Sequence, residues 1–122
     1  MDVLGVMIKT DRMAYIMKNN EIIDRLLTLG KIPKDSEMTD EQFKKYYCLL
    51  AMFEEDLSFE EAEQMMPLFS DECDDLNWFL LHAIESVPHI EVENYKKLIA
   101  KCPNEEFREI LEIRLNNWLN KQ

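Results

Sequence analysis

The histidine and carboxylate side chains in the middle of the 122-residue chain are those whose type and spacing could support chemistry. His82 and Glu85 are three positions apart, so on a helix they would lie one turn apart on the same side. Such a pair can transfer a proton, although a polar pair that only stabilises the helix is the simpler interpretation. No glycine-rich phosphate loop, nucleophile elbow or zinc motif accompanies it. We therefore predict that the protein is not an enzyme.

Metal binding is the second chemistry to consider, because residues 71–75 hold four carboxylates around one cysteine. An EF-hand loop needs ligands at alternate positions, a glycine at the sixth and a glutamate at the twelfth, and this segment lacks that spacing. A di-iron site needs Glu-x-x-His on two helices, whereas His82 and Glu85 occur in the reverse order. We expect neither a metal nor any other cofactor.

Charge is distributed unevenly along the chain. The net charge is −11, and the fifty residues from Tyr46 to Tyr95 contain thirteen Asp or Glu and no Lys or Arg. Exposed helices usually mix both signs, because opposite charges one turn apart attract each other. The asymmetry favours a positively charged protein partner and disfavours nucleic acid, since phosphates carry the same sign as the segment.

Residues 54–75 are the densest part of this acidic segment, with ten carboxylates at expected helix ends and loops. Trp78 follows them and lies off the main apolar stripe of its expected helix, so we expect it to be partly exposed. Aromatic side chains beside charged groups are typical of interfaces. The candidate partner-binding residues are Glu54, Glu55, Asp56, Glu60, Glu61, Glu63, Asp71, Glu72, Asp74, Asp75 and Trp78.

The sequence favours a cytoplasmic protein without membrane association. Its longest uncharged apolar-rich run, Tyr46 to Phe53, is far shorter than the roughly 20 residues that span a bilayer. The N-terminus shows no basic leader or small-residue cleavage site. The three cysteines are widely spaced and form no CxxC pattern, which suits a reducing compartment. The oligomeric state is left open.

The elements that would position these side chains are predicted to be helices. The chain has only two glycines and four prolines, which leaves few places for β-hairpin turns. Apolar periodicity predicts helices over 11–29, 40–55, 59–66, 76–87 and 92–101, and a last helix after Asn104. A further short helix over 3–8 is left open.

Helix-start and helix-end signals support these boundaries. Thr39 with Gln42 and Ser58 with Glu61 fit the capping-box pattern, and Gly30 stands where helices often end. Apolar residues make the helix over 76–87 the clearest, and we expect it to be central, with the stripe Leu76, Phe79, Leu80, Ala83, Ile84 and Val87.

We expect one all-α domain over residues 1–122, with five or six antiparallel helices. They would pack either as an irregular HEAT-like stack of helical hairpins or as a compact bundle. The sequence alone does not choose between the two.

The segment 76–86, Leu-Asn-Trp-Phe-Leu-Leu-His-Ala-Ile-Glu-Ser, resembles the central motif of the immunity protein 30 family of bacterial polymorphic-toxin immunity proteins. Residues 114–117, Arg-Leu-Asn-Asn, look like that family's last helix, so the resemblance covers about residues 71–119. Its sharpest part is the set Trp78, His82, Ile84 and Glu85. The resemblance implies a cytoplasmic helical protein that binds and neutralises a cognate toxin domain.

Charge and resemblance together favour an immunity protein whose acidic surface binds a basic toxin domain, with nucleases among the expected targets. The alternative is a helical adaptor or regulatory subunit that binds a basic segment of another protein. Both hypotheses explain the composition and the charge distribution of the chain equally well. An immunity gene is expected to lie next to a toxin gene, which separates them.

Overall fold

The computed structural model describes residues 17–121, and every regular element in that range is helical. The elements are α1 (Asn19–Leu29), η2 (Asp35–Glu37), α2 (Asp40–Ala51), α3 (Phe59–Met65), η3 (Met66–Leu68), α4 (Asp74–Ile84), α5 (Val92–Lys101) and α6 (Glu105–Asn120), where η marks a single 3₁₀ turn. The all-α prediction is confirmed.

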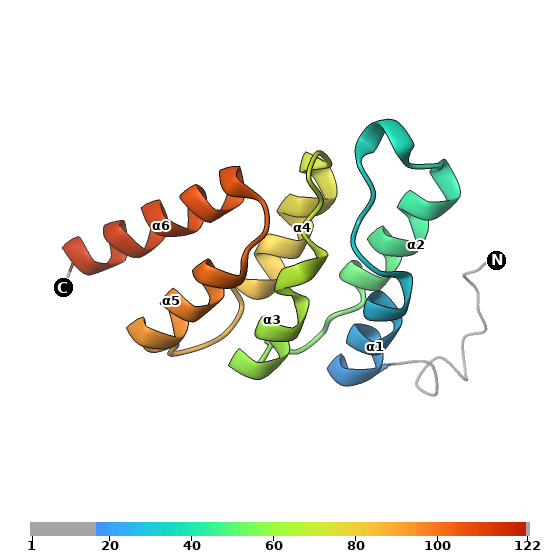
Figure 1. The fold of residues 1–122 in the computed structure, drawn as a ribbon. Helices are drawn as coiled ribbons and strands as arrows, with labels where there is room; N and C mark the ends of the chain where they lie inside the picture. The colour runs from blue at the N-terminus through green and yellow to red at the C-terminus, as the bar shows by residue number, and fades with distance from the viewer. Residues whose placement is uncertain (1–16, 122) are drawn as a thin grey trace.

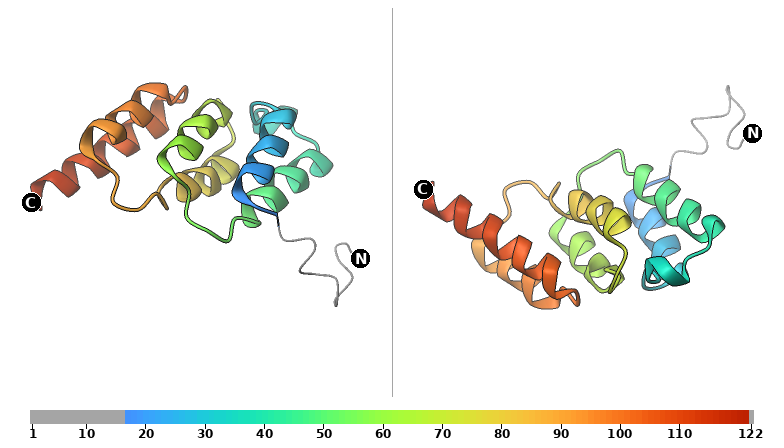
Figure 2. Two further views of the ribbon diagram at one scale, coloured as in Figure 1. Left: turned by 90° about the horizontal axis from the view of Figure 1, so that it is seen from below. Right: turned by 90° about the horizontal axis from the view of Figure 1, so that it is seen from above.

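Consecutive helices form three antiparallel hairpins, α1 with α2, α3 with α4 and α5 with α6, which stand side by side (Figure 1). The first helices of the hairpins, α1, α3 and α5, pack against one another in one layer, and α2 packs against α4 in the other. Figure 2 shows α6 continuing the second layer and then leaning away towards the C-terminus. Of the two expected arrangements, the stack of hairpins is the one observed.

Local capping signals set the helix starts as predicted. The Thr39 hydroxyl accepts from the Gln42 N–H at 3.1 Å, and the Ser58 hydroxyl accepts from the Glu61 N–H at 3.1 Å. Both capping boxes close, because the Gln42 and Glu61 side chains accept from the backbone N–H groups of Thr39 and Ser58 at 2.9 Å each. At the end of α1, Gly30 adopts a φ of 88°, which a residue with a Cβ rarely tolerates.

Several predicted boundaries differ from the structure. Helix α1 begins only at Asn19, and the expected helical residues 3–8 and 11–16 lie outside the described range. Helix α2 ends at Ala51 instead of 55. Helix α4 runs over 74–84 instead of 76–87, because the Ser86 hydroxyl donates to the Ala83 carbonyl at 2.7 Å and the chain then turns towards Pro88.

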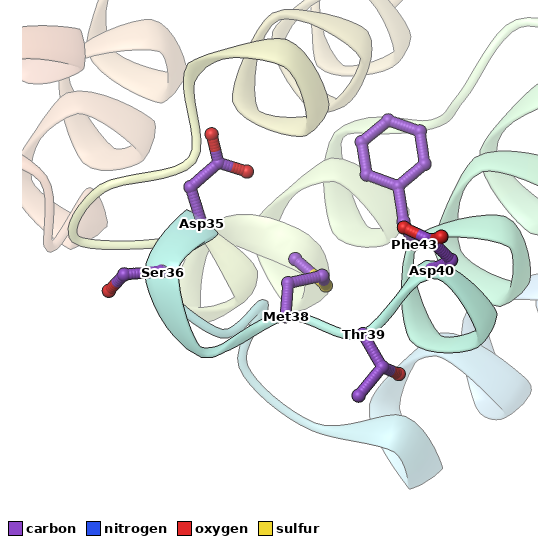
Figure 3. A pocket seen from close by; sticks show the side chains of 6 residues that line it. All are labelled: Asp35, Ser36, Met38, Thr39, Asp40 and Phe43. Atoms are coloured by element: carbon purple, nitrogen blue, oxygen red, sulfur yellow. The ribbon is translucent and has the colours of Figure 1, made fainter.

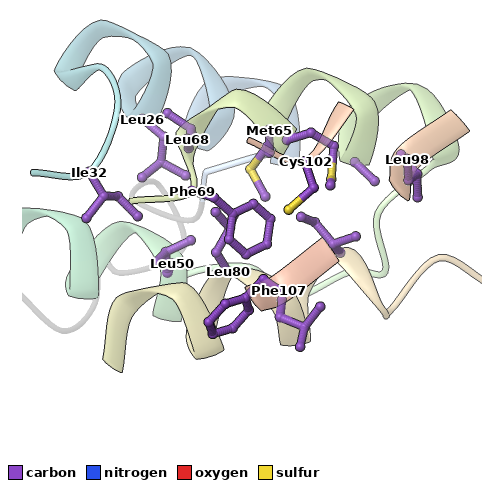
Figure 4. Packing of buried hydrophobic residues seen from close by; sticks show 14 of the residues in the cluster. Leu26, Ile32, Leu50, Met65, Leu68, Phe69, Leu80, Leu98, Cys102 and Phe107 are labelled. Carbon is purple, nitrogen blue, oxygen red and sulfur yellow. The ribbon is translucent and has the colours of Figure 1, made fainter. Parts of the chain in front are cut away.

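The buried apolar side chains form one continuous cluster between the two layers (Figure 4). Phe69 and Phe107 lie at its centre with ring centroids 5.5 Å apart, and Leu80 of α4 is fully buried beside them. The prediction that α4 is central is confirmed through Leu76, Leu80, Leu81 and Ile84, all buried.

The predicted apolar stripe of α4 was wrong at one position. Phe79 is 43% exposed, whereas Leu81, which the stripe left out, is fully buried together with Asn77. The physical reason is that α4 packs against α3 and α2 on adjacent sides. The buried side of α4 therefore includes Asn77 and Leu81, and Phe79 lies at the border between this buried side and solvent.

A buried polar network joins the three hairpins at Ser70. The Ser70 N–H donates to the Asn77 side-chain oxygen at 2.8 Å, and its carbonyl accepts from the Asn77 and Asn104 amides at 3.0 and 2.7 Å. Its hydroxyl donates to the Pro33 carbonyl at 2.9 Å. Asn104 also caps α6 by accepting from the Phe107 N–H at 3.0 Å. Ser70 thus touches the turn of the first hairpin, its own hairpin and the start of α6.

Backbone hydrogen bonds add to this connection. The Ile32 N–H donates to the Leu68 carbonyl at 3.0 Å, and the Asp35 N–H donates to the Glu72 carbonyl at 2.7 Å. The turns of the first and second hairpins therefore lie against each other at one end of the stack.

We predict that Asn77→Ala lowers the free energy of unfolding by about 1–3 kcal/mol, because it leaves the buried Ser70 N–H without an acceptor. Urea denaturation measures the change. Asn117→Ala, at an exposed position of α6, is the control and is expected to change stability by about 0.5 kcal/mol or less. Equal effects of the two substitutions would mean that the network does not stabilise the stack.

Candidate protein-binding surface

The structure divides the ten candidate carboxylates between the two ends of the α3/α4 hairpin. Glu54, Glu55 and Asp56 lie in the loop before α3, while Asp71 and Glu72 lie in the turn after η3. Asp74 and Asp75 form the first turn of α4. Because α3 and η3 separate the two groups, the ten residues do not make one surface (Figure 1).

Three of the candidate carboxylates are engaged inside the protein. Glu61 closes the capping box of α3, Glu63 pairs with Lys101 at 2.9 Å, and Asp71 pairs with Lys31 at 2.9 Å. The Lys31 ammonium donates a hydrogen bond to Asp71 and holds the pKa of that carboxyl below its ordinary value. Both lysines come from outside the base-free segment. Folding therefore places cations beside acids that have none near them in the sequence.

The other acids near the hairpin turns form a group that we call the acidic end: Asp35, Asp40, Glu72, Asp74 and Asp75. All five side chains belong to exposed residues, and none makes an ion pair with another residue of the described range. Asp40 and Asp74 begin α2 and α4, where the positive end of the helix dipole stabilises negative charge. Asp35 and Asp40 are not among the ten candidate carboxylates, because both precede the base-free segment.

The acidic end is compact. The Asp35 backbone is hydrogen-bonded to Glu72, and the Cys73 thiol donates to the Asp35 carboxylate at 3.7 Å. Burial raises the pKa of the Cys73 thiol, and the charges of Asp35 and Asp75 raise it further. The thiol is therefore held neutral and serves as a buried contact between the two turns.

Three aromatic side chains, which we call the aromatic strip, adjoin the acidic end: Phe43 and Tyr47 of α2 and Phe79 of α4. The Phe43 and Tyr47 rings stack at 6.3 Å, and the Tyr47 and Phe79 rings meet edge to face at 5.0 Å. Tyr47 and Phe79 are 42% and 43% exposed. Phe79 lies one turn after Asp75 on the same side of α4, so carboxylate and ring share one face.

A pocket of about 370 Å³ lies between the acidic end and the aromatic strip (Figure 3). Its lining residues are Asp35, Ser36, Met38, Thr39, Asp40 and Phe43. The carboxylates of Asp35 and Asp40 can pair with a positive charge in this pocket. The thioether of Met38 and the ring of Phe43 form its apolar wall. A Lys or Arg side chain, with its apolar stem and charged head, has the matching chemistry.

Trp78 is 38% exposed, which confirms the expected partial exposure. Its ring contacts Phe107 edge to face at 5.1 Å and lies 6.1 Å from the His82 ring. Trp78 thus packs against the start of α6 and lies apart from the ring contacts of the aromatic strip.

Glu85 pairs with Arg114 of α6 at 2.7 Å, so the structure gives it a partner on another helix. His82 is exposed and contacts the Trp78 ring. Over the described residues, no three His, Cys, Asp or Glu side chains are grouped so that they could hold a metal ion. The same range holds no helix with the length and apolar character needed to cross a bilayer.

Comparison with known proteins gives no further guide to the surface. No family model matches the chain, and neither a curated protein nor a solved structure matches it significantly.

The exposed position of Phe79 predicts a small contribution to folding. We expect Phe79→Ala to lower the free energy of unfolding by about 1 kcal/mol, mainly through the lost ring contact with Tyr47. Phe107→Ala, in the core, is the matched comparison and is expected to cost about 3–5 kcal/mol. Chemical denaturation of both variants tests this, and similar losses would show that Phe79 is a core residue.

Proposed function

We propose that the protein is an immunity-type inhibitor that binds a basic toxin domain through the acidic end and the aromatic strip. One observation carries the proposal: the exposed rings of Tyr47 in α2 and Phe79 in α4 meet beside carboxylates of the acidic end that make no ion pair within the described range. Water-exposed rings cost free energy that a partner can recover by covering them.

The two components of the surface have separate roles in binding. Carboxylates at the acidic end attract a basic partner over a distance and raise the association rate, towards about 10⁸–10⁹ M⁻¹s⁻¹ at low salt. The rings of Tyr47 and Phe79 then supply the buried area that slows dissociation, as aromatic side chains do at interface hot spots. Fast and tight binding is what an inhibitor of a toxin requires.

The pocket beside Phe43 supports a specific contact with the partner. A Lys or Arg side chain inserted there would meet the carboxylates of Asp35 and Asp40 while its stem covers Met38. Such a contact would be sensitive to salt, whereas contacts to the aromatic strip would not.

The resemblance of residues 76–86 to the immunity protein 30 family supports the toxin as the kind of partner. An adaptor that binds another basic protein would use the same surface. Identifying the gene beside the one that encodes this protein separates the two, because an immunity protein is expected beside its toxin.

We predict that neutralising the acidic end weakens partner binding, since it removes the attraction that speeds association. Asp40→Asn combined with Asp75→Asn is expected to slow association with the toxin domain about tenfold at low salt and to flatten its salt dependence. Glu54→Gln combined with Glu55→Gln makes the same change in net charge at the opposite end of the hairpin and is the control.

Stopped-flow association with the toxin encoded beside this gene, together with growth rescue in co-expression, gives the measurement. Equal effects of the two double variants would mean that association depends on the net charge of the protein. The acidic end would then not be the binding surface. Failure of the unaltered protein to rescue growth would reject the immunity function itself.

A further inference from the structure

A groove of about 400 Å³ lies between the α4–α5 loop and α6, far along the chain from the acidic end. Its apolar walls come from Val87, Ile90 and Trp118, and its polar groups from His89, Tyr95 and Arg114. A narrower cavity of about 130 Å³ shares Val87, Ile90 and Tyr95 with it. Pockets of this size, apolar with a few polar groups on one side, are typical of small-ligand sites.

Arg114 contributes a guanidinium group to the groove, and Glu85 is its ion-pair partner. Its Nε lies 2.7 Å from a Glu85 carboxylate oxygen in an ion pair, and the side chain is 42% exposed. The two terminal nitrogens make no hydrogen bond with another residue of the described range. A guanidinium held at Nε can still donate two parallel hydrogen bonds from those nitrogens, which is the geometry that binds a carboxylate.

Tyr95 supplies a second donor. Within residues 17–121, its hydroxyl has no hydrogen-bond partner among the groups that influence it, which are the charges of Glu85 and Arg114. Burial raises the pKa of Tyr95 to about 12, with the Glu85 charge adding to the effect and Arg114 opposing it. The phenol therefore stays protonated at physiological pH and is available to donate.

The loop that carries His89 is held in a conformation that costs energy. His89 has a φ of 52°, in the left-handed region that side chains with a Cβ disfavour. The loop is fixed at its start, where the Ser86 hydroxyl accepts from the Leu57 N–H at 2.9 Å and donates to the Ala83 carbonyl. Strain of this kind, kept in place by surrounding contacts, is found most often at binding sites.

The charge around the groove differs from that of the whole protein. Residues 88–122 contain six acidic and six basic side chains, in a chain whose net charge is −11. An anion that approaches this hairpin is therefore not repelled as it would be at the acidic end. Glu85 and Arg114 form an ion pair, so their opposite charges offset each other at the groove.

We propose that this groove binds a carboxylate borne on an apolar group, with the carboxylate on Arg114 and Tyr95 and the apolar group between Val87, Ile90 and Trp118. A free apolar acid and the carboxyl end of a peptide with an apolar last residue share this chemistry. None of the residues that line this groove belongs to the acidic end or the aromatic strip.

The test uses the full chain and two pairs of probes. N-acetyl-L-phenylalanine is compared with its amide, and the peptide Ala-Ala-Phe with the same peptide amidated at its C-terminus. Binding is followed by NMR chemical-shift changes of the amides over 87–95 and of the Trp118 indole. We expect millimolar or tighter binding of the acid of at least one pair, and binding of its amide at least about tenfold weaker.

Variants separate recognition by the groove from general attraction to the protein. Arg114→Gln is expected to weaken binding of the acid about tenfold, and Tyr95→Phe, which retains the ring, about three- to tenfold. Arg25→Gln, at an exposed position of α1, is the control and should leave binding unchanged. Equal binding of acid and amide, equal effects of Arg114→Gln and Arg25→Gln, or no binding of any probe would each overturn the proposal.

Discussion

Ser70 carries the constraint on which the rest of the structure depends. It is completely buried, and each of its polar groups must find a partner because a buried polar group without a hydrogen bond costs about 1–3 kcal/mol. Pro33, Asn77 and Asn104 supply those partners from three different parts of the chain. The turns of the hairpins are thereby brought to one end of the stack. Helices α2, α4 and α6 each begin directly after such a turn, so their N-termini meet at that end and collect the acids that favour the positive end of a helix dipole.

This arrangement changes how the charge of the sequence is understood. Along the chain, residues 54–75 contain ten acids and no cation. In space, Lys31 and Lys101 approach from the neighbouring hairpins and neutralise Asp71 and Glu63. Acids from outside the segment, Asp35 and Asp40, join those that remain. The charge of one sequence segment therefore shows that the protein is acidic, but the carboxylates that make no ion pair in the described range come from separate segments, 35–40 and 72–75 among them.

What the sequence predicted well was local. The capping pairs at Thr39 and Ser58, the bounds of α5 and the cap at Asn104 depend on residues within one helical turn, so they can be read from one short segment. The exposure of Phe79 and Tyr47 and the burial of Asn77 depend on which sides of α4 and α2 face the other helices. Periodicity identifies an apolar side but does not fix its rotation when two neighbours pack on adjacent sides, and a buried asparagine carries no signal of its own.

The segment that resembles the immunity protein 30 family has a structural explanation in the second and third hairpins. Trp78 packs on Phe107, Glu85 pairs with Arg114, and Ile84 is buried beside the cavity that Leu111 lines. Three of the four residues that carry the resemblance thus hold α4 against α6. The aromatic strip includes none of the four, and its rings contact one another between α2 and α4. The contacts of Trp78 and Glu85 include neither Tyr47 nor Phe79, so substitutions at these two exposed rings are expected to leave them intact. Trp78, Ile84 and Glu85 therefore have structural roles between α4 and α6, whereas the exposed ring of Phe79 faces Tyr47 of α2.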